Sequence, residues 1–286
     1  MAKKTDRWLQ LRKSVEINDG LEVRKAQVWT EDKLWWWNKY IDITTAALVG
    51  RNKWPHDLVY VDLFAGPGIL EFESGERIPG SPLLAMRAAK PFTKVLLCEK
   101  NHSRALACKK RAQSLATTQS IRVFEGDCNE QIGLICNSIP ANALTLAFID
   151  PTGLHASFET LATLTENRSV DLLILFADFM DIIRNVATYA QQSQSNLDQV
   201  LGPDCDWRSE WHSLADHSAA KVSRLFVQLY QNQLREHLGY EHFGDEVLYL
   251  DRGVPLYRIL FASRNPLGLK FWNESTKKQR GSDRLF

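Results

Sequence analysis

Residues 59–68 read VYVDLFAGPG, and this stretch decides the fold that we expect. An apolar run ends at the acid Asp62, and Gly66 and Gly68 follow in a turn. Glycine has no Cβ, so the backbone of such a turn can approach a ligand closely. A dinucleotide fingerprint needs a third glycine, and that position holds Glu71. The stretch therefore predicts a strand, a ligand-binding turn and a helix, and it argues against a nicotinamide oxidoreductase.

Short apolar runs alternate with helical patterns on the C-terminal side of this turn. We expect buried strands at residues 58–64, 94–98, 121–124, 144–149 and 170–176, and helices at 82–90 and 102–114. Such alternation predicts a parallel α/β sheet with right-handed crossovers. Ligands of these sheets lie beyond the carboxyl ends of the strands.

The rest of the chain predicts additions to that sheet. Leu34, Trp37, Ile41 and Leu48 share one face of an amphipathic helix over residues 31–50. Three adjacent tryptophans, 35–37, cannot share a face, so we expect at least one to pack inward. Residues 178–238 are mostly helical in pattern. Two further strands, 246–250 and 256–263, flank the turn at 251–255 and predict a C-terminal antiparallel hairpin.

Together these patterns predict a Rossmann-like class I methyltransferase fold, with a mostly parallel seven-stranded sheet and a C-terminal antiparallel hairpin. We expect one domain over residues 1–286. Its parts are an N-terminal helical extension at 1–56, a cofactor-binding half at 57–176, a helical cap at 177–240, and the hairpin with a tail at 241–286.

Composition limits the functional classes. With 44% hydrophobic and 24% charged residues, the chain is typical of a globular protein, and no run of eighteen apolar residues suggests a membrane helix. The five cysteines form no C-x-x-C pair, so they predict neither a zinc site nor a disulfide framework, and we expect a reducing cytoplasm. Residues 1–30 and 264–286 together carry a net charge of +7, against −6 for the middle. These basic ends could bind phosphate groups, but charged tails that are only solvated have the same composition.

Two further acids stand at successive strand ends. Glu99 can accept hydrogen bonds from both hydroxyls of a ribose, and Asp127 from an adenine amino group, with Cys128 beside the ring. Glu99 lies 37 residues after Asp62, because an insertion at 69–80 precedes a helix with Ser81 as its expected N-cap and Pro82 next. The insertion suits a lid or substrate loop, and equally a passive surface excursion.

The acids and the glycine turn together predict an S-adenosylmethionine site. Methyltransferases keep an acid at the position of Asp62, near the cationic aminoacyl end of this cofactor. The expected cofactor loop comprises Phe64, Ala65, Gly66, Pro67 and Gly68. A plain strand-to-helix turn is the alternative for the loop alone, but three acids at three strand ends are hard to explain by chance.

Residues 148–153, FIDPTG, resemble the motif with which amino-methyltransferases hold a target nitrogen. Asp150 and Pro151 fit that motif and are the expected catalytic residues, acting mainly by orienting the acceptor. Thr152 and Gly153 replace the second proline and the aromatic residue, and His155 or Phe158 could supply a ring instead. An Asp-Pro turn at a strand end is the structural alternative. Asp178 and Asp181, with Arg184, predict an ordinary surface network.

The chain resembles the three-Cys-motif partner family, a set of bacterial methyltransferase-like proteins, over most of its length. The resemblance rests on residues 29–34 (WTEDKL), 62–68 (DLFAGPG), 80–82 (GSP), 148–151 (FIDP) and 261–268 (FASRNPLG). It implies the methyltransferase fold, the S-adenosylmethionine cofactor and a partner protein that carries three cysteines, of radical or iron–sulfur type.

The sequence therefore predicts a methyl transfer to a nitrogen or oxygen nucleophile, with nucleic acid as one candidate acceptor. A protein or a small molecule is the alternative acceptor. The rival of another class is a non-catalytic scaffold on the same fold that works through its three-cysteine partner.

Overall fold

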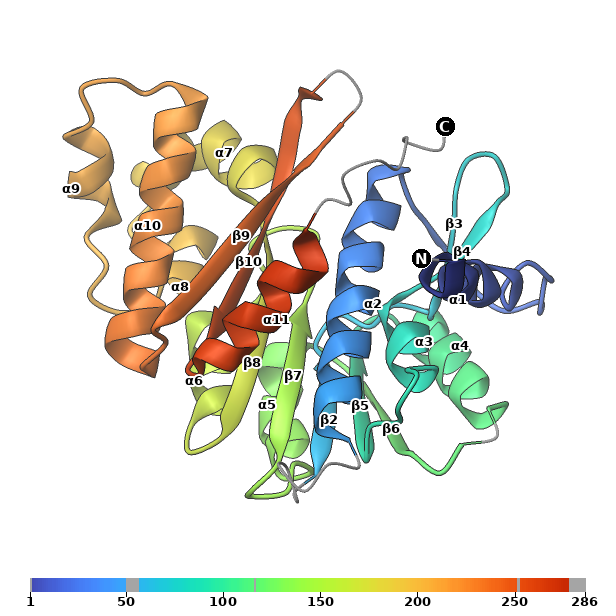
Figure 1. Cartoon of the computed structure of the whole chain (residues 1–286). Coiled ribbons are helices and arrows are strands. Elements are labelled where there is room, and N and C mark those ends of the chain that lie inside the picture. The colour runs from blue at the N-terminus through green and yellow to red at the C-terminus, as the bar shows by residue number, and fades with distance from the viewer. Residues whose placement is uncertain (1, 50–56, 116, 251–252, 278–286) are drawn as a thin grey trace.

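The computed structural model describes residues 2–49, 57–115, 117–250 and 253–277. A central sheet runs through the molecule in the order β6-β5-β2-β7-β8-β10-β9 (Figure 1). Its strands are β2 (Leu58–Asp62), β5 (Lys94–Glu99), β6 (Ser120–Glu125), β7 (Leu144–Ile149), β8 (Ser169–Phe176), β9 (His242–Tyr249) and β10 (Pro255–Ser263). The five strands predicted for the first half of the sheet are confirmed, each to within two residues at either end.

The pairing of the strands identifies the fold. β2, β5, β6, β7 and β8 are mutually parallel, and β10 is antiparallel to both β8 and β9. The strand order reverses at β2, which pairs with β5 on one side and β7 on the other. This arrangement, with one antiparallel strand inserted between the last two positions, is the Rossmann-like class I methyltransferase fold. The predicted fold class is confirmed, and the reversal at β2 marks the edge where ligands of such sheets bind.

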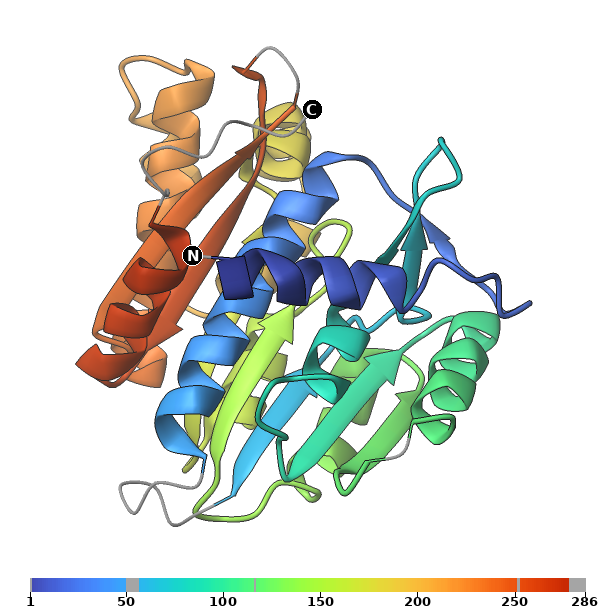
Figure 2. The ribbon, with the colours of Figure 1, turned by 45° about the vertical axis from the view of Figure 1, so that its right-hand side comes forward.

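Helices cover both faces of the sheet (Figures 1 and 2). One face carries α1 (Ala2–Lys13), α2 (Trp29–Leu48), α3 (Ser81–Met86), α4 (His102–Gln113) and α11 (Pro266–Thr276). The other carries α5 (Cys128–Cys136), α6 (Phe158–Thr165), η1 (Asp178–Ile182), α7 (Ile183–Ala190), α8 (Asn196–Leu201), α9 (Trp207–His212) and α10 (Ala219–Leu238). None of these described helices is long and apolar enough to span a membrane.

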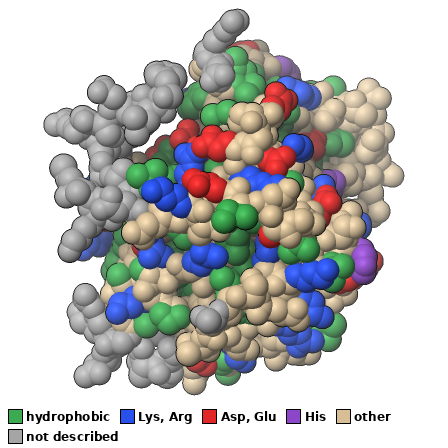
Figure 3. Space-filling model, turned by 90° about the vertical axis from the view of Figure 1, so that its right-hand side faces the viewer, with side chains coloured by type: hydrophobic (Ala, Val, Ile, Leu, Met, Phe, Trp, Pro, Cys, Tyr) green, Lys and Arg blue, Asp and Glu red, His purple; other side chains and the backbone are tan. Residues whose placement is uncertain are grey.

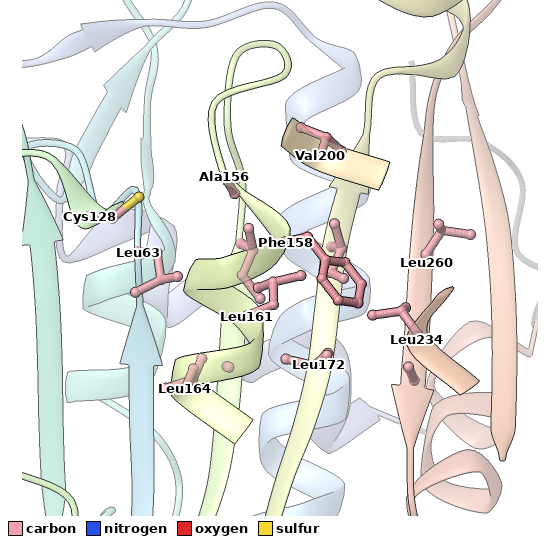
Figure 4. Packing of buried hydrophobic residues seen from close by; sticks show 14 of the residues in the cluster. Leu63, Cys128, Ala156, Phe158, Leu161, Leu164, Leu172, Val200, Leu234 and Leu260 are labelled. Carbon is pink, nitrogen blue, oxygen red and sulfur yellow. The ribbon is translucent and has the colours of Figure 1, made fainter. Parts of the chain in front are cut away.

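Both hydrophobic layers follow from the alternation of side chains along the strands. Leu34, Trp37, Ile41 and Leu48 of α2 are buried, which confirms the predicted apolar face. Of the three adjacent tryptophans, only Trp37 is fully buried, while its two neighbours are half-buried. On the opposite face, side chains of α5, α6, α8 and α10 interlock over β2, β7 and β8 (Figure 4).

A second, small sheet stands beside the carboxyl edge of the large one. It joins β1 (Arg24–Lys25), β3 (Ile69–Glu71) and β4 (Arg77–Pro79), with β1 parallel and β4 antiparallel to β3. The predicted insertion at 69–80 is thus a hairpin that the N-terminal segment completes. Figure 2 shows α1 lying across α2 next to this sheet, and Trp8 donates from its indole to Glu31, 3.0 Å away.

Two local predictions differ from the structure. Gly80, and not Ser81, is the N-cap of α3. Its nitrogen donates to the Gly68 carbonyl at 2.8 Å, and a Cβ at Gly80 would lie only 3.1 Å from that oxygen. This tight crossing makes glycine the residue that fits there, and it frees Ser81 for the site described below. In the predicted hairpin turn, residues 251 and 252 lie outside the described residues, as do residues 50–56 and the basic tail at 278–286.

Candidate functional site

The predicted cofactor loop leaves β2 at Asp62 and is fixed to the two neighbouring strands. Leu63 donates its N–H to the Phe148 carbonyl of β7 at 3.1 Å, and Ala65 donates to the Cys98 carbonyl of β5 at 2.8 Å. Gly66 and Gly68 have φ values of +65° and +91°, which L side chains rarely adopt. The sequence places glycine at both points where the backbone needs this conformation, so the loop is held in one shape.

Glu99 connects the end of β5 to this loop. One carboxylate oxygen accepts from Gly66 N at 2.8 Å, and the other accepts from Asn101 N at 2.7 Å. The residue is 9% exposed. An ionised carboxylate has about four lone-pair positions, so both oxygens keep capacity for further donors such as ribose hydroxyls.

Asp62 is fully buried at the end of β2. It accepts hydrogen bonds from Phe64 N at 3.1 Å, from Tyr60 Oη at 3.3 Å and from the Ser81 hydroxyl. Burial raises the pKa of Asp62 to about 7, and the bond from Ser81 opposes that rise. A cation placed beside this carboxyl would favour its ionised form.

A hydrogen-bonded relay of two buried side chains, Trp37 and Tyr60, ends at Asp62. Trp37 of α2 donates its indole N–H to Tyr60 Oη at 2.9 Å, and Tyr60 in turn donates to Asp62. Trp37 also stacks on Phe148, with 5.0 Å between ring centroids. The helix that precedes the sheet therefore helps to orient the acid at the centre of the site.

Asp127 and Cys128 lie at the next strand end, after β6. Asp127 is the N-cap of α5, accepting from Asn129 N at 2.9 Å, and it pairs with Lys100 at 3.0 Å. Its side chain is 27% exposed, so a ligand can reach it. Cys128 is buried near Leu63 in the core (Figure 4), and burial raises the pKa of its thiol to about 12. Its predicted contact with an adenine ring stays a prediction.

Asp150 and Pro151 follow β7 at the reversal point of the sheet. The Asp150 carboxylate forms an ion pair with Lys33 of α2, whose side chain is only 5% exposed. Lys33 Nζ lies 5.5 Å from the Trp29 ring centroid and 6.0 Å from that of Phe148. The predicted acceptor-orienting acid therefore has an internal cationic partner 117 residues away in the chain.

A cavity of about 190 Å³ joins the loop to this ion pair. It is lined by the loop, the Asp-Pro motif, α2, β1, Gly80, Ser81 and β10. The charged and aromatic side chains among its lining residues include Arg24, Trp29, Lys33, Phe64, Asp150 and Tyr257. Five predicted site residues line it, namely Phe64, Ala65, Gly66, Asp150 and Pro151. The other predicted site residues do not line it. Pro67 and Gly68 belong to the loop itself, and at or just after the ends of β2, β5 and β6 lie Asp62, Glu99, Asp127 and Cys128.

Arg111 of α4 connects the N-terminal segment at residues 19–22 to the cofactor loop. This buried guanidinium binds both oxygens of Asp19 at 2.8 Å and the Glu22 carbonyl at 2.7 Å. It also donates to the Pro67 carbonyl of the cofactor loop at 2.7 Å. One side chain thus joins the loop to the segment that carries Arg24 into the cavity.

Two predictions about neighbouring residues were wrong. Asp178 and Asp181 do not form a surface network with Arg184. Asp178 is fully buried and pairs with Arg258 at 3.1 Å and with the Ser223 hydroxyl at 2.6 Å, because the π-helix η1 turns it into the core.

Phe158 cannot supply a ring to the site, since it packs in the core between α6, α8 and α10 (Figure 4). The aromatic side chains that line the cavity are instead Trp29, Phe64 and Tyr257, and Trp29 stacks on Tyr257 with 5.1 Å between ring centroids.

Among the residues that the structure describes, no group of three or more His, Cys, Asp or Glu side chains could hold a metal ion. The predicted site residues did not include three that the structure places at the site, namely Lys33, Ser81 and Arg111. A signal existed for Lys33, because it lies one helical turn before Trp37 on the apolar face of α2.

No protein-family model matches the chain, and no curated protein sequence does. Solved structures with a similar fold include protein LPL1258 from Legionella pneumophila, at 12% identity over 83% of this chain and 89% of that chain, with a TM-score of 0.50. Others are an O-methyltransferase from Bacillus cereus in complex with SAH (10% identity, 90% and 89% covered, TM-score 0.47) and the O-methyltransferase TomG from Streptomyces achromogenes in complex with SAM (10%, 91% and 98%, 0.45). The Legionella protein agrees with the fold described above, and nothing about the activity of this chain follows from the three.

Proposed function

We propose that this chain binds S-adenosylmethionine and transfers its methyl group to an acceptor. The observation that carries the proposal is the bond between Gly66 N and the buried Glu99 carboxylate, next to buried Asp62, at the point where the strand order reverses. Two acids and a fixed glycine loop meet there, and ligands of this sheet topology bind at that edge. No Ser-His-Asp or Cys-His arrangement is needed for a displacement reaction, which depends on alignment.

Open space beside Gly66 supports this placement of the cofactor. A Cβ added at Gly66 would meet no atom within 4 Å, so the space beyond the loop is open. In this proposal Asp62 lies near the cationic aminoacyl end, Glu99 accepts from the ribose hydroxyls, and Asp127 accepts from the adenine amino group. The bound cofactor supplies a methyl group on a positively charged sulfur. The loop residues Phe64–Gly68 hold it by backbone contacts.

Asp150 and Pro151 face the same cavity as the loop and are proposed to meet the acceptor. Nitrogen and oxygen acceptors are both compatible with a carboxylate at this place. A nucleic-acid acceptor has weaker support, because basic side chains on the face that carries α1, β3 and α4 lie interspersed with acidic ones (Figure 3). Nucleic-acid surfaces usually group their basic residues.

Calorimetric titration with S-adenosylmethionine and S-adenosylhomocysteine tests the cofactor assignment. We expect micromolar binding by the wild type, and at least a tenfold loss in Glu99→Gln and in Asp62→Asn. Glu125→Gln is the matched control, since Glu125 ends the neighbouring strand β6 but is exposed and pairs with His102. Absence of binding by a folded wild type would contradict the proposal, and so would equal losses in Glu99→Gln and the control.

A scaffold function is the second candidate, and the closed Lys33–Asp150 pair favours it. An acceptor-orienting acid that is already ion-paired suits a fold that has lost its reaction, as does the replacement of the motif's aromatic residue at Gly153. The scaffold would work in the cytoplasm with a three-cysteine partner of radical or iron–sulfur type, as the family resemblance implies. Stable co-purification with such a partner, without methyl transfer by either protein or by the complex, would favour the scaffold over the enzyme.

A further inference from the structure

Lys33 occupies the place at which an amine acceptor would be expected. Its Nζ donates to Asp150 Oδ2, the oxygen that would otherwise accept an N–H from the acceptor. The ammonium is held between the rings of Trp29 and Phe148 and is almost fully buried, yet it lines the cavity. A buried charge of this kind needs its partner to remain stable, so Lys33 and Asp150 act as one unit.

This unit is poorly matched to an amine and well matched to an anion. An incoming amine would compete with Lys33 for the carboxylate, and a protonated amine would be repelled by the ammonium. An acceptor oxygen, in contrast, can take a hydrogen bond from Nζ, and the bond is stronger when that oxygen is ionised. The pair therefore selects for oxygen over nitrogen.

The other charged groups around Lys33 are few and can be named. Burial and the nearby Arg24 lower the pKa of Lys33, while Asp150 and Asp62 oppose that shift. Tyr257 of β10 also lines the cavity, and burial and Asp150 raise the pKa of its hydroxyl. Three cationic side chains line the cavity, namely Arg24, Lys25 and Lys33. Lys25 pairs with Glu71 and Lys33 with Asp150, and Arg24 is close enough to Lys33 to act on its pKa as a second cation.

Aromatic side chains form the wall next to these cations. Trp29 stacks on Tyr257 with an interplanar angle of 30°, and both line the cavity with Arg24 and Lys33. Rings of this kind hold other rings by offset or edge contacts. A phenol, whose pKa is near 10 as in tyrosine, also ionises far more readily than an aliphatic alcohol.

We propose that the methyl acceptor is an aromatic hydroxyl and that the Lys33 ammonium binds it as the phenolate. The inference rests on the proposed function and deepens it. On binding, the O–H bond breaks and its proton passes to water, while the oxygen keeps the electron pair. That pair then forms the O–CH₃ bond as the S–CH₃ bond breaks, and the electrons of the broken bond stay on sulfur. Asp150 keeps Lys33 charged and in position.

Binding of 4-nitrophenol tests the inference without any methyl transfer, because its phenolate absorbs visible light. We expect the apparent pKa of bound 4-nitrophenol to fall by about one unit relative to the free dye, which corresponds to a tenfold preference for the phenolate. 4-Nitroaniline, the matched amine, is expected to bind at least tenfold more weakly. Lys33→Met should remove the pKa shift, and Lys33→Arg should retain part of it. Lys39→Met, on the same helix, is the control.

The outcomes separate this inference from the cofactor assignment. No binding of 4-nitrophenol, no shift in its pKa, equal binding of 4-nitroaniline, or an unchanged shift in folded Lys33→Met would each overturn the inference. Titration of S-adenosylhomocysteine into the same preparations reports on the cofactor site. If the dye shift is present and S-adenosylhomocysteine does not bind, the proposed function fails while the anion site at Lys33 stands.

Discussion

Replacing Arg111 with methionine should release the N-terminal segment from the cofactor loop. Methionine keeps the apolar length of the side chain but removes the guanidinium, which binds Asp19 through two bonds and the carbonyls of Glu22 and Pro67. The loss leaves the Pro67 carbonyl without this donor and Asp19 without its cation. Both groups belong to segments that the sequence places far apart, so no local structure replaces the contact.

The size of the effect follows from the burial of the two partners. Breaking a buried ion pair costs about 3–5 kcal/mol when the remaining charge stays buried. The Asp19 side chain is 34% exposed and can be rehydrated, which lowers the cost. The Pro67 carbonyl is buried, and leaving such an acceptor unpaired costs about 1–3 kcal/mol. We therefore expect Arg111→Met to lower the free energy of unfolding by about 2–4 kcal/mol.

Urea denaturation followed by tryptophan fluorescence measures this change. Lys110→Met is the control, because Lys110 is the exposed neighbour on the same helix. Trypsin should also cleave the variant faster at Arg24 and Lys25, whose strand β1 depends on the anchored segment. A loss below about 0.5 kcal/mol, within the range of ordinary surface substitutions, together with unchanged cleavage, would show that Arg111 does not anchor the N-terminal segment.

Three further predictions concern the site itself. Asp62 has a folded pKa of about 7 against an ordinary value of 3.8, so the folded state holds the proton more tightly. The stability that this provides is full below pH 3.8 and is lost as the pH rises to 7. Urea denaturation should therefore show that, between pH 3.8 and 7, the free energy of unfolding of the wild type falls by up to about 1.4 kcal/mol per pH unit relative to that of Asp62→Asn. A difference between the two proteins that does not change with pH would contradict the raised pKa of Asp62. Gly66→Ala should lower the free energy of unfolding by only about 1–2 kcal/mol, the cost of its positive φ, because a Cβ there meets no other atom within 4 Å. The same change should weaken S-adenosylhomocysteine binding at least tenfold in calorimetry, and an unchanged affinity would place the ligand elsewhere. Tyr60→Phe leaves the buried Trp37 indole N–H unpaired and should cost about 1–3 kcal/mol, whereas a neutral effect in thermal unfolding would mean that the relay adds nothing.

The parallel strands could be predicted because each contains a short apolar run that ends near a polar residue. β9 (HFGDEVLY) is different, because it carries polar residues in its first half and begins four residues before the predicted start at 246. β7, predicted at 144–149, has those limits in the structure, and β5 ends one residue later than predicted, at Glu99. A continuous apolar run indicates burial on both faces of a central strand, and such a run is a local property of the sequence. The glycine positions could be predicted for the same reason, since a positive φ is a local requirement.

The elements that were missed depend on contacts between distant segments. α1 carries many charged residues, and its apolar face is short, with Trp8 and Leu11 buried against the core. The helix is also held by contacts such as Arg7 with Asp42. β1 has two residues and exists only because β3 pairs with it. The three-residue strands β3 and β4 are too short for a periodic signal.

The candidate site likewise contains residues that the local sequence predicts and a contact between distant segments that it does not. The acids at the strand ends could be read from the sequence, because topology alone brings strand ends to one edge. The pairing of Lys33 with Asp150 could not, since nothing in either segment indicates the other. A lysine on the apolar face of a helix was the one available hint, because such a position is costly without a buried partner.

Hydrogen–deuterium exchange with and without S-adenosylhomocysteine tests whether the ligand binds at the cofactor loop, because it locates the ligand without assuming an acceptor. We expect slower exchange at residues 63–68 and 99–101 and at the start of α5 when S-adenosylhomocysteine is bound, with little change in α9 and α10. Binding that protects none of the cofactor loop, or that protects only the helices on the far side of the sheet, would contradict the proposed cofactor site.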